Sequence, residues 1–367
     1  MAFSKSAVAI IVFALAILRL PDSAASDASH FGGFDAIYSF GDSMADTGNL
    51  IREGLGPIGA FDRFPYGETY FGRPTGRCSN GRLMIDFIAE RFDLPFLNAY
   101  LDRNASFANG VNFAVAGATA LDASYLESVG IVLPFTKSSL NVQLDWFETH
   151  LASLCSTHEQ CIAKLDTALF FLGEIGGNDY NYAIFKGKTI SEATSLMPLI
   201  IKNLKDAAKK VIKHGARHLI VPGNFPTGCA TCYLTAFRST NSSDYDGRRC
   251  LKRYNEFAQL HNNQLQLMLQ GLREQFPSVN IQYADYYNVS LQVLDNAQTL
   301  GVDMESRFQA CCGGGGEYNF DPNAMCGENG TSTCSDPSKH LSWDGMHMTE
   351  MAYREMVASL FAGNLKG

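Results

Sequence analysis

The chain has little charge and few long apolar runs, and both shortages narrow its possible functions. Only 18% of its 367 residues are charged, and the formal net charge at pH 7 is -8. Such an acidic chain repels nucleic acid and anionic membrane surfaces, so we expect neither as a partner. Beyond Leu18 no apolar run approaches the ~20 residues that cross a bilayer, so stable membrane insertion is not expected. With 46% hydrophobic residues, the chain has ample material for a core, although composition does not indicate an oligomeric state.

Several common catalytic motifs are also missing. The sequence has no G-x-S-x-G, so the usual α/β-hydrolase elbow lacks support. It has no G-x-x-x-x-G-K-[ST] and no H-E-x-x-H, so P-loop and zinc-protease functions lack support as well. A single C-x-x-C, Cys229 to Cys232, could form a zinc site together with Cys311 and Cys312. We favour disulfides for these residues and predict neither a metal nor a cofactor.

The N-terminus resembles a targeting segment. Lys5 precedes the apolar run Ala7–Leu18, and small residues follow up to Ala25. A run of this length suits a cleaved secretory signal better than an uncleaved anchor. We therefore predict a signal peptide over residues 1–25, leaving residues 26–367 as a single domain.

Sequons and cysteines agree with secretion. Four N-x-[ST] sequons predict glycosylation at Asn104, Asn241, Asn288 and Asn329. The ten cysteines are an even number, as expected of disulfides formed in an oxidising compartment. Cys155 and Cys161 flank a short polar loop and are expected to pair, whereas the other pairings cannot be read from the sequence. The glycine-rich segment Cys311–Cys334 is predicted to be a disulfide-stapled loop that carries the chain toward Asp344.

Short apolar runs alternate with helical patterns along the chain. The stripe of apolar residues in Leu196–His214, and a second one in Tyr254–Phe276, each predict a long amphipathic helix. This alternation predicts a parallel sheet covered by helices on both faces, in one domain without linkers or repeats. The predicted strands are Ala36–Phe40, Val111–Val115, Ala168–Leu172, His218–Val221 and Ile281–Tyr283.

A serine and a histidine stand out as a candidate catalytic pair. Ser43 follows directly on the strand Ala36–Phe40, and the carboxyl ends of parallel strands are where such sheets bind ligands. A serine hydroxyl becomes nucleophilic only beside a base that a carboxylate orients. Of the eight histidines, only His347 has an aspartate, Asp344, three residues earlier. His261 lies on an apolar helical stripe and is interpreted as a core residue.

Other histidines are not expected to take part in catalysis. His150, His158 and His340 lie in polar sequence contexts, and we expect them to face solvent.

Donors for a developing oxyanion follow other strand ends. The Ser43 amide, the amide of Gly117 after Val111–Val115, and the side chain of Asn178 after Ala168–Leu172 are the candidates. Taken singly, these motifs are also typical of turns or of a helix start. Their joint occurrence at strand ends favours a catalytic site.

Together these blocks resemble the plant GDSL esterase/lipase family within the SGNH hydrolases. The resemblance covers almost the whole mature chain, and the stretches Phe64–Gly81 and Val111–Phe113 also look similar to the branch that includes acetylajmalan esterase and sinapine esterase. The fourth residue of the family name, leucine, is Met44 here, a volume-conserving apolar change. The resemblance implies a flavodoxin-like three-layer α/β/α sandwich with a central parallel sheet, the SGNH hydrolase fold. The matching blocks are Phe40–Ser43, Asp46–Asn49, Phe64–Gly67, Gly76–Arg82, Asn112–Gly117, Gly176–Asp179, Cys311–Gly314 and Trp343–His347.

The resemblance also implies a role for each candidate residue. Ser43 would be the nucleophile, His347 the general base and then acid, and Asp344 the residue that orients it. The Ser43 amide, Gly117 and Asn178 would form the oxyanion hole. We therefore expect a secreted serine esterase, in the apoplast or a vacuole, acting through an acyl-enzyme on a small-molecule ester of a plant metabolite.

Three alternatives remain open at this stage. The same triad serves an acyltransferase that uses an alcohol or amine in place of water. A lipase would act on long-chain acyl esters. A binding protein could retain the scaffold without catalysis.

Overall fold

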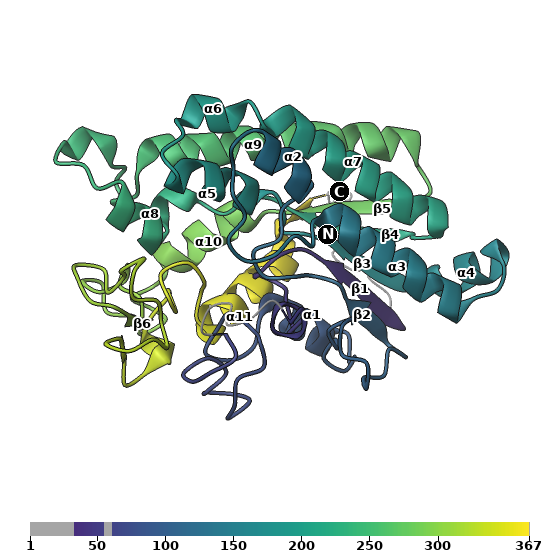
Figure 1. The fold of residues 1–367 in the computed structure, drawn as a ribbon, viewed down its shortest axis with the longest axis horizontal. Helices are drawn as coiled ribbons and strands as arrows, with labels where there is room; N and C mark the ends of the chain where they lie inside the picture. The colour runs from purple at the N-terminus through teal and green to yellow at the C-terminus, as the bar shows by residue number, and fades with distance from the viewer. Residues whose placement is uncertain (1–32, 55–60, 367) are drawn as a thin grey trace, which may run out of the picture. The chain divides into compact units, whose positions relative to one another are not determined.

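A six-stranded sheet lies at the centre of the fold in this computed structural model, which describes residues 33–54 and 61–366 (Figure 1). Its strand order is β2-β1-β3-β4-β5-β8, and all neighbours are parallel except β5 and β8. The described residues from Gly33 onward form one compact unit. The predicted signal peptide, residues 1–25, lies outside the described residues. The strands are β1 Ala36–Phe40, β2 Gly110–Asn112, β3 Ala168–Leu172, β4 His218–Pro222, β5 Asn280–Ala284 and β8 Leu365–Lys366.

Helices cover both faces of this sheet, which gives the predicted three-layer α/β/α architecture. The helices α3, α7 and α9 pack in sequence on one face, and α1, α11 and α10 pack together on the other (Figure 1). The helices are α1 Met84–Arg91, α2 Ala123–Ser128, α3 Leu140–Leu154, α4 His158–Leu165, α5 Gly177–Phe185, α6 Ile190–Thr194, α7 Met197–His214, α8 Thr231–Ala236, α9 Lys252–Gln275, α10 Tyr286–Asp295 and α11 Glu350–Ser359.

Burial on both faces explains why the central strands are continuous apolar runs. Every residue of β1 and of β3 is buried. Across these two strands the rings of Tyr38 and Phe170 stack with centroids 5.1 Å apart, and Phe147 of α3 meets Phe170 edge-on at 5.7 Å. These contacts form an aromatic core between β1, β3 and α3.

The prediction for the second strand was wrong in its extent. Strand β2 ends at Asn112, whereas the pattern predicted Val111–Val115. The side chain of Asn49 donates to the carbonyls of Asn112 and Ala114, at 2.9 and 2.8 Å. The amides of Phe113 and Val115 still donate to the carbonyls of Ser39 and Gly41, at 2.7 and 3.1 Å, so the apolar run stays beside the chain of β1 beyond the end of β2. The other four predicted strands and both long helices agree with the structure to within two residues at each end.

Four disulfides are present among the described residues. The expected pair Cys155–Cys161 is confirmed, and Cys78 and Cys232 are buried free thiols. Three of the four sulfurs suggested for a zinc site are bridged, so the zinc alternative has no support. In the described ranges no group of three or more side chains could hold a metal ion. The remaining bridges are Cys229–Cys250, Cys311–Cys334 and Cys312–Cys326.

The expectation that His150 faces solvent was wrong. Helix α3 turns this residue inward, where it is 5% exposed and its ring lies 6.0 Å from that of Tyr38. Burial lowers the pKa of His150 to about 4. By contrast, His261 is a core residue as predicted, with Nδ1 bonded to the Tyr180 hydroxyl at 2.9 Å.

The four asparagines of the sequons are all exposed, namely Asn104, Asn241, Asn288 and Asn329. Their exposure is compatible with glycosylation, which stays a prediction. Among the helices described here, none has the length and apolar character that a membrane span requires.

Candidate active site

Two strand ends are fastened together around Ser43. Strands β1 and β3 pair in register up to Phe40 and Leu172, and the chain beyond each remains bonded to the other. The amide of Asp42 donates to the carbonyl of Glu174 at 3.2 Å. A Cβ atom on Gly41, whose φ is +147°, would lie only 3.0 Å from that same carbonyl oxygen. Glycine is therefore required where the chain turns to present Ser43.

Asp344 and His347 form a buried hydrogen-bonded pair. The Nδ1 atom of His347 lies 2.7 Å from Oδ2 of Asp344. The other oxygen, Oδ1, accepts the amides of Met346 and His347 at 2.9 and 2.8 Å. Because Nδ1 donates to the carboxylate, Nε2 of the neutral imidazole is left as an acceptor.

The electrostatics of this pair favour a charged imidazolium. Burial lowers the pKa of His347, but the Asp344 carboxylate, helped by Asp42, more than offsets this and raises it above its ordinary value. Burial likewise raises the pKa of Asp344, but the charge and hydrogen bonds of His347 bring it below its ordinary value. The pair is therefore suited to accept a proton and hold it.

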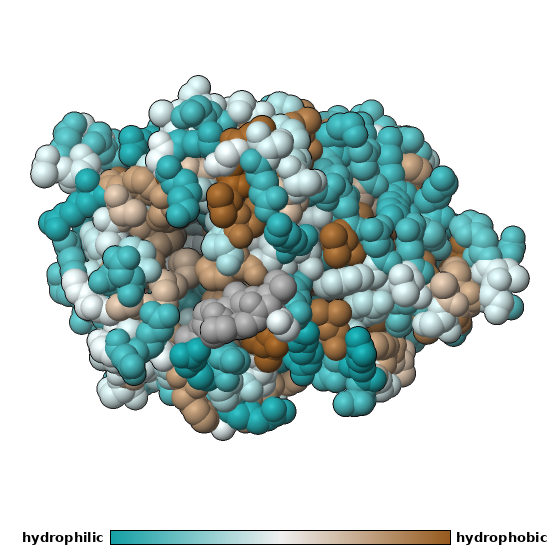
Figure 2. Space-filling model, viewed as in Figure 1, coloured by the Kyte–Doolittle hydropathy of each residue, from teal (hydrophilic) through white to brown (hydrophobic). Residues whose placement is uncertain are grey.

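One cavity of 610 Å³ brings the candidate side chains together. Ser43, Asn178 and His347 all line it. In Figure 2 apolar side chains interrupt a largely hydrophilic surface, some of them beside a hollow. Binding sites for small molecules are typically apolar concavities with a few polar groups of this kind. The aromatic residues of the wall include Phe61, Tyr66, Phe135, Tyr182, Phe225 and Phe308.

The two candidate backbone donors are unengaged. Among the described residues, neither the amide of Ser43 nor that of Gly117 donates to a protein acceptor. Gly117 has a φ of +82°, and its carbonyl accepts the hydroxyl of Tyr182 at 2.7 Å. Gly117 is not itself among the residues that line the cavity, but it lies against Phe135 and Tyr182, which are. Both amides thus meet one requirement for binding an oxyanion.

Asn178 differs from these amides because its donors are already engaged. It stands near the start of α5, just after Gly176, whose φ is +113°. Its Nδ2 group donates to Oδ2 of Asp42 and to the carbonyl of Ala118, both at 3.0 Å. An oxyanion would have to replace one of these two acceptors.

Comparison with known proteins identifies the family. The model of the GDSL-like lipase/acylhydrolase family matches residues 37–360. The chain belongs to this family. It is 46% identical to acetylajmalan esterase of Rauvolfia serpentina over 334 residues, which cover 91% of this chain and 86% of the relative. It is 48% identical to a GDSL esterase/lipase of Arabidopsis thaliana over 337 residues, covering 90% and 85%. The chain is accordingly a carboxylic-ester hydrolase, and the resemblance seen in the sequence is confirmed.

In this GDSL hydrolase two further aspartates hold the turn around Gly117. Oδ2 of Asp46 accepts the amide of Ala116 at 2.8 Å. Asp179 accepts the amides of Ala120 and Leu121 at 2.8 and 2.9 Å. The motifs containing Asp46 and Asp179 were visible in the sequence, but their role as backbone clamps was not.

Sequence analysis also missed a carboxyl pair in the cavity wall. The side chains of Asp42 and Glu174 are hydrogen-bonded to each other and buried, at 3% and 6% exposed. Burial raises the pKa of Asp42 to about 6, while the Met44 amide and Glu174 act in the opposite direction. Burial, and then the charge of Asp42, raise the pKa of Glu174 well above its ordinary value. Of the two carboxyls, Glu174 is therefore the one that holds a proton more strongly than an ordinary glutamate does.

The disulfide-stapled segment supports Asp344 from the other side. The amides of Cys311 and Cys312 donate to the carbonyls of Ser342 and Trp343, at 2.9 and 2.7 Å. The bridges Cys311–Cys334 and Cys312–Cys326 close this segment, as the sequence predicted. The segment therefore fixes the two residues immediately before Asp344.

Proposed function

We propose that this GDSL hydrolase is a secreted serine esterase that forms an acyl-enzyme on Ser43. The observation that supports this best is the shared cavity of Ser43 and His347, with His347 bonded through Nδ1 to the buried Asp344. This leaves Nε2 as the atom that would accept the proton of the serine hydroxyl.

The proposed reaction proceeds in two halves. The oxygen of Ser43 attacks the ester carbonyl as His347 takes its proton, and the resulting oxyanion accepts hydrogen bonds from the amides of Ser43 and Gly117. His347 then gives the proton to the departing alcohol, which leaves an acyl group on Ser43. In the second half a water, deprotonated by His347, releases the acid and restores the serine.

Asn178 would join the oxyanion hole by exchanging one acceptor for another. Its bond to Asp42 is the contact that faces the cavity, since both residues line it. When the oxyanion replaces Asp42 as acceptor, the Asp42 carboxyl keeps its hydrogen bond with Glu174. The carboxyl pair would thus make this exchange less costly.

For the substrate we propose a small acyl ester of a bulky, ring-bearing plant metabolite. The cavity of 610 Å³ is far larger than a short acyl group needs, and its aromatic walls suit ring faces. The relative from Rauvolfia serpentina, by its name, acts on acetylajmalan. Long-chain lipid esters are the competing substrates that an apolar cavity also admits.

The nucleophile is tested by hydrolysis of p-nitrophenyl acetate with the wild type and the Ser43→Ala variant. We expect the variant to lose at least about 10³-fold in kcat. Thr231→Ala is the control, because Thr231 lines the same cavity but donates its hydroxyl to the Phe308 carbonyl at 2.6 Å. A fluorophosphonate probe should label Ser43 in the wild type. Full activity in Ser43→Ala would exclude Ser43 as the nucleophile.

The substrate class is tested by a screen across acyl length and alcohol size. We expect acetyl esters of polycyclic alcohols to give a higher kcat/KM than palmitoyl esters of glycerol. The reverse order would favour a lipase. Adding acceptor alcohols to the same assay separates transfer from hydrolysis, and a product dominated by the transferred acyl group would favour an acyltransferase.

Secretion is supported by the four disulfides and by the exposed sequons. Expression of the full chain in plant cells provides the test. We expect the extracellular or vacuolar protein to begin near residue 26 and to lose mass on treatment with a glycosidase. An intact N-terminus at Met1 in a cytosolic fraction would contradict the proposal.

A further inference from the structure

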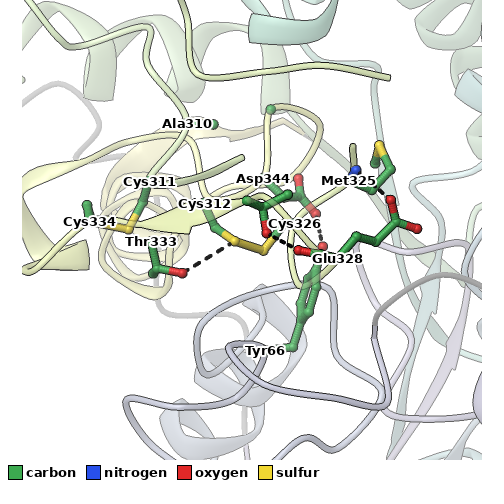
Figure 3. Close-up of a disulfide and its surroundings, with 12 residues drawn as sticks. Tyr66, Ala310, Cys311, Cys312, Met325, Cys326, Glu328, Thr333, Cys334 and Asp344 are labelled. Atoms are coloured by element: carbon green, nitrogen blue, oxygen red, sulfur yellow. Dashed lines mark hydrogen bonds between the residues drawn. A yellow bond between two sulfur atoms is a disulfide. The ribbon is translucent and has the colours of Figure 1, made fainter. Parts of the chain in front are cut away.

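A tyrosine from a distant part of the chain contacts the proposed triad. The hydroxyl of Tyr66 donates to Oδ2 of Asp344 at 2.8 Å (Figure 3). This is the same oxygen that bonds Nδ1 of His347 at 2.7 Å. Tyr66 is 1% exposed and also lines the cavity.

The Asp344 carboxylate is fully satisfied with this tyrosine in place. Oδ1 accepts two backbone amides, and Oδ2 accepts His347 and Tyr66. Because each oxygen accepts two hydrogen bonds, the carboxylate cannot rotate freely about its Cβ–Cγ bond. Without the tyrosine hydroxyl, the imidazole is the only group that holds Oδ2, and one buried lone pair loses its donor.

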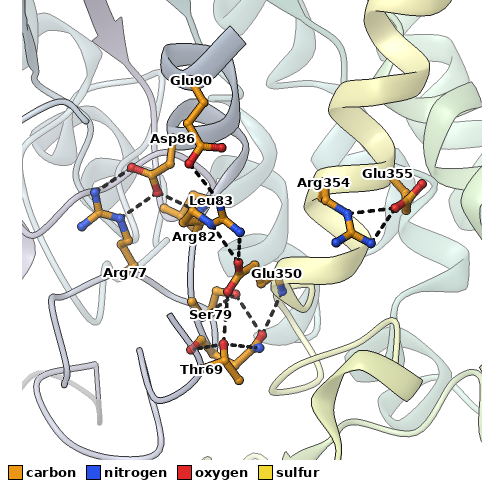
Figure 4. Close-up of polar contacts among 12 residues, drawn as sticks. Thr69, Arg77, Ser79, Arg82, Leu83, Asp86, Glu90, Glu350, Arg354 and Glu355 are labelled. Atoms are coloured by element: carbon orange, nitrogen blue, oxygen red, sulfur yellow. Dashed lines mark hydrogen bonds and ion pairs between the residues drawn. The ribbon is translucent and has the colours of Figure 1, made fainter. Parts of the chain in front are cut away.

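The position of Tyr66 is itself held from several sides. Its ring packs edge-on against Phe61 and Trp343, with centroids 5.1 and 5.9 Å apart. The segment that follows it is fastened by ion pairs to the helices on one face of the sheet (Figure 4). Arg77 pairs with Asp86 of α1, and Arg82 pairs with Glu350 of α11.

We propose that Tyr66 is a positioning residue of the triad, which fixes the Asp344 oxygen that orients His347 and shares part of its negative charge. The inference rests on the proposed function, since it assigns to Asp344 and His347 the roles given above. Tyr66 acts through Asp344 and is not required to touch the reacting atoms.

Loss of the hydroxyl has two separable consequences. The carboxylate is less restrained, so the imidazole is less often aligned with Ser43 and kcat falls. The carboxylate charge is also less shared, so it holds the protonated imidazole more strongly and moves the acid limb of the pH–rate profile to higher pH. The ring remains in Tyr66→Phe, so the cavity wall and KM are preserved.

The other titratable groups near these residues are unchanged by the substitution. Those facing His347 are Asp344 and Asp42. Those facing Tyr66 are Asp344, Cys78 and Glu328. A displaced acid limb in Tyr66→Phe is therefore attributable to the contact with Asp344.

The experiment compares Tyr66→Phe with Tyr70→Phe, a control on the same segment whose residue is 46% exposed. Hydrolysis of p-nitrophenyl acetate is followed from pH 4 to 9, with the unfolding midpoint of each variant. For Tyr66→Phe we expect kcat to fall about 10- to 100-fold, as loss of one hydrogen bond to a charged group implies. KM should stay within about twofold, and the acid limb should move to higher pH. Tyr70→Phe should match the wild type in all three.

Two results would overturn the inference. One is a Tyr66→Phe enzyme with the kcat and acid limb of the wild type. The other is a lower kcat with an unmoved acid limb and a lowered unfolding midpoint, which indicates a structural role alone. Fluorophosphonate labelling separates the two proposals. If Ser43 is labelled while Tyr66→Phe behaves as the wild type, only the tyrosine inference fails, whereas an active Ser43→Ala removes the proposed function itself.

Discussion

Removing Arg77 should destabilise the fold far more than removing an ordinary surface arginine. Its guanidinium binds Asp86 through two bonds of 2.8 and 2.7 Å, and both side chains are buried, at 7% and 0% exposed. Asp86 also accepts the amide of Leu83 at the start of α1. The substitution Arg77→Met keeps most of the apolar stem but leaves the Asp86 carboxylate buried without its cation.

The expected loss follows from this uncompensated charge. Breaking a buried pair by removing one partner costs about 3–5 kcal/mol, whereas an exposed pair is worth about 0–1 kcal/mol. With an unfolding entropy of about 2.1 cal/mol/K per residue, a unit of ~330 residues loses 1 kcal/mol for each fall of ~1.4 °C in its melting temperature. We therefore expect a fall of roughly 4–7 °C for Arg77→Met.

The matched control is Arg354→Met, since the pair Arg354–Glu355 lies at the surface with side chains 57% and 28% exposed (Figure 4). Melting is measured by circular dichroism under non-reducing conditions for both variants, for Asp86→Asn and for Arg77→Met/Asp86→Asn. The double variant removes the buried charge as well as its partner, so it should lose less than the sum of the single losses. Equal melting temperatures for Arg77→Met and Arg354→Met would refute the reasoning.

Two predictions concern activity. The rate should fall toward acid pH, because His347 acts as a base only when its imidazole is unprotonated. The midpoint should lie above the ordinary pKa of histidine, because the Asp344 carboxylate more than offsets burial and raises the pKa of His347. A rate that is flat down to pH 4 on a stable enzyme would contradict this. Gly117→Ala should lose about 100-fold in kcat, since its new Cβ would lie 2.8 Å from that of Phe135. Gly130→Ala has a similar positive φ but open space around it, so it should lose about 1 kcal/mol of stability and retain full activity; equal activity in the two variants would show that the Gly117 turn is not part of the site.

The sheet was predictable because its strands are buried on both faces. Short continuous apolar runs such as Ala36–Phe40 and Ala168–Leu172 indicate strands that are buried on both faces, and their bounds agree with the structure. The run after Asn112 was misleading because it stays buried and bonded to the chain of β1 after the regular strand has ended, while the Asn49 side chain bonds two of its carbonyls. The antiparallel edge strand β8 has two residues and carries no pattern to recognise.

The site was predictable only in part. Ser43, Asp344 and His347 stand in short local motifs, so their residue types and spacing could be recognised. Tyr66 and Glu174 act through contacts between segments that no local pattern links, and Tyr66 lies 278 positions from its acceptor. His150 was misjudged for the same reason, since its sequence neighbours are polar while its helix faces the core.

We expect the cysteine-bridged segment 311–334 to make the site of this hydrolase depend on oxidation more than its central sheet does. Among the described residues no strand of the six-stranded sheet contains a cysteine, so no bridge is attached directly to that sheet. Asp344 of the proposed acid–base pair, however, follows directly on Ser342 and Trp343, whose carbonyls accept the amides of Cys311 and Cys312. In a thiol-rich compartment we expect a well-formed scaffold with a loosely held imidazole. The newly made chain would then be inert toward the esters of its own cell until it reaches surroundings that close its bridges.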